Sequence, residues 1–338
     1  MAAGLKVGGP KGFWDTIKSV SAAEIAREAN RPISIAIVGT PEQRENAIQA
    51  LYDVELPATK NRSLPESPFV QGFDDMSPEA RFPRDQSVFD FVIDLGAGRA
   101  DAPESTRVYA IVDLGGWDAT LARILEDRPE LALALARNFP VFRRRVAQKI
   151  ITHASATNAQ FALLTGITAA VPLLDLLLPA TSLSDFIMLT KNQAMMTLRL
   201  AAAYGLPVDY RSRARDLAPV LANGFGWRAI AREIVGAIPF GVGIAAKASI
   251  AYAGTASLGK AVQYFYETGE TVTAAQAKRL YRDAYETARE KVKALSAALK
   301  KNKGSPSGKM LPPGDMSVAD SELALDDVAE RQHAEPVA

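Results

Sequence analysis

The segment that decides the fold is Asp185-Phe-Ile-Met-Leu-Thr-Lys-Asn-Gln-Ala-Met-Met-Thr-Leu-Arg-Leu-Ala-Ala-Ala-Tyr-Gly205. Its apolar positions recur at steps of three and four, which predicts one long helix. The preceding residues, 150–184, contain a single formal charge, Asp175, and are interrupted by Pro172 and Pro179. We expect an apolar helical hairpin here, with the rest of the chain leading to it or packing against it.

The composition limits the classes of function. A chain of 338 residues is long enough for two domains. Its 39 Lys and Arg against 38 Asp and Glu give a net charge of +1, which lacks the basic excess that nucleic-acid binding needs. With no cysteine and only two histidines, His153 and His333, neither a thiolate nor a histidine cluster is available for a metal. We predict no metal, no cofactor and no nucleic-acid partner.

The pattern of residues 31–138 predicts a small α/β domain, preceded by a helical segment in residues 1–30. Short β-branched runs at 33–38, 88–95 and 107–114 predict three strands of a mainly parallel sheet. Helical patterns at 42–52 and 119–138 alternate with them. Residues 53–87 carry five prolines and no sustained period, so we expect a long loop there.

The turn after the first strand is the first candidate for a nucleotide site. A phosphate-binding loop has the pattern Gly-x-x-x-x-Gly-Lys-Ser/Thr, because glycine lets backbone N–H groups approach phosphate and lysine neutralises its charge. Counting from Gly39, this chain has Arg44 at the second glycine, Glu45 at the lysine and Asn46 at the hydroxyl, while Pro41 removes an N–H donor. We expect a sheet that keeps its shape without a nucleotide, with Gly39 as the remaining candidate residue.

Asp113-Leu-Gly-Gly116 is the second candidate. It fits Asp-x-x-Gly, the pattern that senses magnesium and the γ-phosphate in small GTPases. The pattern is short, and a glycine turn after a strand accounts for it equally well. Asp113 and Gly116 therefore remain candidate nucleotide-binding residues, and no residue is assigned a catalytic role.

Polar residues within the apolar helices are candidates for buried, structural roles. Gln193 falls in an apolar stripe, and a buried amide without a partner costs about 1–3 kcal/mol. Asp185 begins the same helix. Asp175 and Lys247 are the only formal charges in the stretches 150–184 and 234–259. They form a natural ion pair if the two stretches pack together, and otherwise each of them caps a helix end.

The apolar stretches allow two interpretations. Residues 161–180 are long enough to cross a bilayer, but they are also long enough for a buried hairpin in a soluble bundle. Asp175 argues against simple lipid exposure. Basic residues on both sides, from Arg143 to Lys149 before the stretch and Lys191 and Arg199 after it, favour both ends on the cytosolic face if the hairpin enters a membrane.

Several spaced blocks of the second half resemble one known family. Leu189-Thr-Lys-Asn-Gln193, Ala203-Tyr-Gly205, Phe225-Gly-Trp-Arg228 and Ala251-Tyr-Ala-Gly254 occur in order within residues 138–270. They resemble the bacterial YcjF-like domain of unknown function. The resemblance implies a helical module, often membrane-associated and often attached to Era-like or dynamin-like GTPases. No catalytic residue can be carried over from it.

These observations together predict a degenerate nucleotide-binding-like α/β domain (31–138), an all-α, strongly apolar domain (139–300) and a disordered, dispensable tail (301–338). The helix before the tail begins at the capping box Thr273/Gln276. We expect a non-catalytic scaffold on the cytoplasmic face of the inner membrane, in contact with lipid and with a protein partner, either a GTPase or a second copy. The alternatives are an active GTPase with an unorthodox phosphate loop and a soluble, cytoplasmic helical protein with a structural role.

Overall fold

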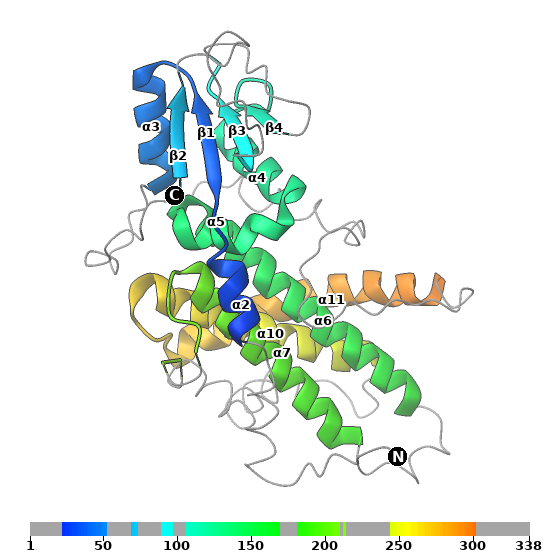
Figure 1. The fold of residues 1–338 in the computed structure, drawn as a ribbon. Helices are drawn as coiled ribbons and strands as arrows, with labels where there is room; N and C mark the ends of the chain where they lie inside the picture. Colours follow the sequence, from blue (N-terminus) through cyan, green and yellow to red (C-terminus); the bar gives the residue numbers. More distant parts are fainter. Residues whose placement is uncertain are drawn as a thin grey trace, which may run out of the picture.

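Among the described residues, a four-stranded parallel sheet forms one end and helices form most of the remainder (Figure 1). The computed structural model describes residues 22–52, 69–73, 89–96, 106–169, 181–209, 212–213 and 244–301. The strands are β1 (Ser34–Val38), β2 (Phe69–Phe73), β3 (Phe91–Asp94) and β4 (Arg107–Ala110), in the order β2-β1-β3-β4. The prediction of a small parallel sheet followed by helices is confirmed.

Strand β2 corrects the prediction of a three-stranded sheet with a loop over residues 53–87. Phe69–Phe73 pairs in parallel with β1, from Ser34 opposite Phe69 to Val38 opposite Phe73. Nearby prolines and Gly72 hid this strand in the sequence pattern. Packing explains why a glycine is suited to position 72, because a Cβ there would lie 2.8 Å from Cδ and Nε of Arg44. The Arg44 side chain therefore packs against the backbone of β2 at Gly72.

Helices cover one face of the sheet. The helices near it are α2 (Ala22–Ala29), α3 (Pro41–Tyr52), α4 (Trp117–Asp127) and α5 (Ala132–Asn138), with short 3-10 turns η2 (Pro129–Leu131) and η3 (Pro140–Phe142). Pro129 begins η2 and separates α4 from α5 within the predicted helical pattern of residues 119–138. Side chains of alternate strand residues share one core with α3 and α4: Ile35, Ile37, Phe91, Ile93, Tyr109, Ala47, Leu51, Leu121 and Ile124.

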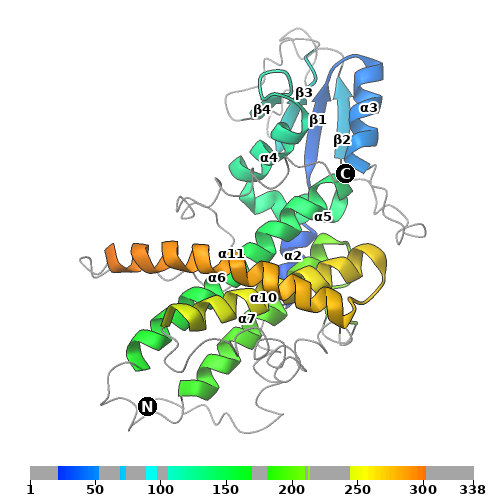
Figure 2. The same cartoon turned by 180° about the vertical axis from the view of Figure 1, so that it is seen from behind.

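Four long helices form the bundle at the other end of the molecule. They are α6 (Arg143–Ala169), α7 (Thr181–Ala203), α10 (Ile244–Thr268) and α11 (Ala274–Lys301). Helix α10 packs against α6, α7 and α11, so it is the central member. In Figure 2, α11 lies across α6 and α10 on the side facing the reader.

The start of α11 confirms the predicted capping box. The Thr273 N–H donates to Oε1 of Gln276 at 2.8 Å, and the Gln276 N–H donates to Oγ1 of Thr273 at 3.3 Å. The apolar stripe of α11 is buried at Tyr281, Ala284, Ala288 and Val292. Leu280, the residue before Tyr281, is only partly buried.

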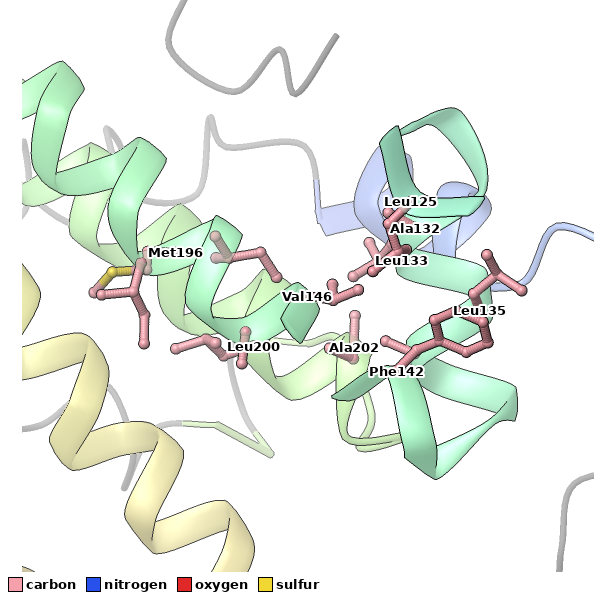
Figure 3. Packing of buried hydrophobic residues seen from close by; sticks show 14 of the residues in the cluster. Leu125, Ala132, Leu133, Leu135, Phe142, Val146, Met196, Leu200 and Ala202 are labelled. Atoms are coloured by element: carbon pink, nitrogen blue, oxygen red, sulfur yellow. The ribbon is translucent and has the colours of Figure 1, made fainter. Parts of the chain in front are cut away.

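One core connects the sheet to the bundle. Figure 3 shows its middle, where side chains of α4 and α5 and Phe142 of η3 lead to Val146 of α6 and to Met196, Leu200 and Ala202 of α7. A second, smaller cluster comprises the strand residues Ala36, Val38 and Val92 together with Phe89, which precedes β3. Because buried side chains continue across residues 138–139, the position of the sheet relative to the bundle is set by packing rather than by a linker.

Two glycines of α10 give a test of this packing. A Cβ at Gly259 would lie 2.7 Å from Cγ1 of Ile151 and 3.0 Å from Sδ of Met196, whereas nothing lies within 4 Å of a Cβ at Gly254. Gly259→Val should lower the free energy of unfolding by about 1–3 kcal/mol, because overpacking shifts helices α6 and α7. Gly254→Val, the matched control, should change it little or raise it slightly, since valine is a better helix former than glycine. Equal effects in chemical denaturation would contradict the close contact.

Candidate functional site

The strand order places the candidate site at the carboxyl ends of β1 and β3. From β1 the chain passes through α3 to β2 on one side, and β3 lies on the other side of β1. Open parallel sheets bind ligands where the strand order reverses in this way, outside the carboxyl ends of the strands. Gly39 and Thr40 follow β1, and Leu95 and Gly96 follow β3. These four residues define what we call the β1–β3 end.

A capping box closes the N-terminus of α3 at the β1–β3 end. The Thr40 N–H donates to Oε1 of Gln43 at 2.9 Å, and the Gln43 N–H donates to Oγ1 of Thr40 at 3.3 Å. The free N–H groups of a helix N-terminus are what bind phosphate in nucleotide-binding folds. Here a side chain of the same helix accepts the bond from Thr40, and Pro41 has no N–H to offer.

Gln43 also joins the two strand ends to each other. Its Nε2 donates to the carbonyl oxygen of Leu95 at 3.3 Å. A Cβ at Gly39 would lie 3.0 Å from Cβ of Leu95 and 3.1 Å from Oε1 of Gln43, so these groups pack closely. One amide side chain therefore satisfies a donor of the β1 turn and an acceptor of the β3 turn.

Arg44 is the only cation in the sequence of residues 39–46, and its side chain bonds to the loop that precedes α3. Its guanidinium NH1 donates to the carbonyl oxygen of Gly39 at 2.6 Å. The side chain lies against Gly72 of β2, as the 2.8 Å approach described above shows. Glu45 and Asn46, which stand where a phosphate loop has lysine and a hydroxyl, are exposed on α3.

Asp94 is a residue of the β1–β3 end that the sequence motifs did not single out. It ends β3, is buried, and its Oδ1 accepts a bond from the Gly96 N–H at 2.9 Å. Gly96 has φ +85°, a conformation that favours glycine. The signal was present in the sequence, since residues 94–96 repeat the Asp-Leu-Gly of residues 113–115. The capping-box spacing of Thr40 and Gln43 was the other missed signal.

Asp113 and Gly116 lie in the turn after β4, away from β1. Asp113 is exposed, and Gly116 has φ +117° at the start of α4, where its carbonyl oxygen accepts a bond from Oγ1 of Thr120 at 2.8 Å. Strand β3 separates β4 from β1. Two strand spacings put the ends of β4 and β1 about 10 Å apart. Gly39 therefore has Asp94 and Gln43 near it through β3 and α3, while Asp113 and Gly116 shape the turn that starts α4.

A second concentration of polar groups lies inside the bundle. Nδ2 of Asn192 donates to Oδ1 of Asn158 and to the carbonyl oxygen of Ala154, both at 2.8 Å. Nδ2 of Asn158 donates to Oγ1 of Thr255 at 2.7 Å. Gln193, a candidate from the sequence, is partly buried and donates from Nε2 to the same Thr255 oxygen at 3.2 Å. These contacts, which we call the amide cluster, connect α6, α7 and α10.

Among the other candidate buried charges, only the side chain of Lys247 is described. Lys247 is exposed in the first turns of α10, which differs from the buried environment that its apolar neighbours suggested. The reason is helical geometry, since Ala248 and Ser249 face inward while Lys247 falls on the outward face. Asp175, its expected partner, lies outside the described residues. Asp185 belongs to α7, but its side chain is likewise outside the described part.

Two of the basic residues expected to flank a membrane segment are buried at helix junctions. Arg143 donates from Nε to the carbonyl oxygen of Ala136 at 3.2 Å, and its guanidinium carbon lies 6.0 Å from the ring centre of Tyr204. Burial and a 2.6 Å bond to Glu267 raise the pKa of Tyr204. Arg199 is 8% exposed and its NH1 donates to Glu28 of α2 at 3.0 Å. These arginines hold helices together.

Comparisons with known proteins found no relative. No family model, no curated protein and no solved structure matches this chain. In the described ranges, no helix is both long and apolar enough to cross a bilayer. The same ranges contain no group of three or more histidine or carboxylate side chains that could hold a metal ion.

The capping box at the β1–β3 end can be tested with two glutamines of α3. Gln43→Ala removes the side-chain acceptor of the Thr40 N–H and the donor to the Leu95 carbonyl oxygen, so it should lower the free energy of unfolding by about 0.5–2 kcal/mol. Gln49→Ala, at an exposed position of the same helix, is the matched control and should change it by a few tenths at most. Urea denaturation would measure both, and an equal effect of the two substitutions would contradict the role given to Gln43.

Proposed function

We propose that this protein is a non-catalytic scaffold whose α/β domain has the shape of a nucleotide-binding domain and makes protein contacts instead. The observation that carries the proposal is the pair of bonds made by Gln43. Its Oε1 accepts from the Thr40 N–H, and its Nε2 donates to the Leu95 carbonyl oxygen. The place where a phosphate would meet the helix N-terminus is therefore bonded internally.

The chemistry of the loop supports the same conclusion. Binding a phosphate there would require breaking the capping box, and Pro41 supplies no N–H in return. Arg44, the cation of residues 39–46, donates to the Gly39 carbonyl oxygen, while Glu45 adds a negative charge on the same helix. Like charges repel, so a triphosphate gains little from this loop.

A rigid joint between sheet and bundle supports a scaffold. The shared core and the Arg199–Glu28 ion pair hold α2, α5 and α7 together. An adaptor that presents two surfaces to partners benefits from such fixed geometry, because less order is lost on binding. We propose a protein partner, a GTPase or a second copy of this chain, in keeping with the resemblance to the YcjF-like domain.

We further propose that the scaffold works at the cytoplasmic face of the inner membrane, held by the apolar region between α6 and α7. Both helices extend from the neighbourhood of the sheet to the opposite end of the molecule, where α6 ends and α7 begins (Figure 1). Near that end of α6, Phe161 and Leu164 are only partly buried. The sequence continues through residues 170–180, where Asp175 is the only charge. Apolar side chains at one tip can enter the interfacial layer of a bilayer without spanning it.

The nucleotide part of the proposal predicts the outcome of a titration. Calorimetry of the purified chain with GTP and magnesium should show no binding in the micromolar range or tighter, because the Thr40 N–H and Arg44 are already bonded. An active GTPase titrated in parallel serves as the positive control. A micromolar dissociation constant would instead favour an active GTPase with an unorthodox loop.

The membrane part predicts the behaviour of one pair of variants. In cell fractionation the chain should sediment with membranes, and Leu176→Glu/Leu177→Glu should move it to the soluble fraction, because carboxylates at the tip oppose insertion. Ile48→Glu changes an exposed apolar residue of α3, at the sheet end, and should leave the distribution unchanged. If wild type stays soluble, or if both variants behave alike, the tip is not the membrane contact.

A further inference from the structure

We draw no further inference here: the strongest candidate, the edge strand β4 with the exposed side chains of Val108 and of Val112 in the turn that follows it, is an unpartnered apolar edge, and nothing in the described part of the chain shows what covers it.

Discussion

The need to satisfy buried amides fixes how the bundle packs. Asn158 is 2% exposed and Asn192 is 6% exposed, and each must find hydrogen-bond partners or cost about 1–3 kcal/mol. Their partners lie on different helices, with Thr255 on α10 and the Ala154 carbonyl oxygen on α6. Only one register of α6, α7 and α10 brings these groups together. Gly259 permits the close approach that this register requires.

The sheet depends on that register through the shared core. Leu133 and Leu135 of α5 are buried in the shared core, where α5 packs on α2, α6 and α7, and Arg143 is bonded to the end of α5. At the amino ends of β1 and β3, the carboxylate of Asp90 accepts bonds from the Ser34 N–H and from Arg128. The strand-turn-helix arrangement of β1 and α3 is thus held by neutral packing and by its own capping box. This packing and the capping box hold the arrangement of β1 and α3 without a bound phosphate.

Local signals predicted the elements whose ends are set by their own side chains. The β-branched run became β1, and the Thr273/Gln276 spacing became the start of α11. Strand β2 was not predicted, because its pairing with β1 and the packing of Arg44 against Gly72 are contacts between distant segments. The same limit explains Arg143 and Arg199, since a sequence shows a basic residue but not the carbonyl or carboxylate it meets. In the candidate site, Gly39 was found from its motif, whereas Asp94 required knowledge of which strands are neighbours.

The ion pair between Glu28 and Arg199 joins residues that are 171 positions apart. Helix α2 also packs on α5 and α7, so its buried residues, Ile25 and Ala29, gain their full environment only when α7 is present. During synthesis at about 5–20 residues per second, α2 must wait on the order of ten to thirty seconds for its partner to leave the ribosome. The burial of Ile25 and Ala29 is therefore completed only after the bundle helices have been made. Until then, part of the apolar surface of α2 stays in contact with solvent.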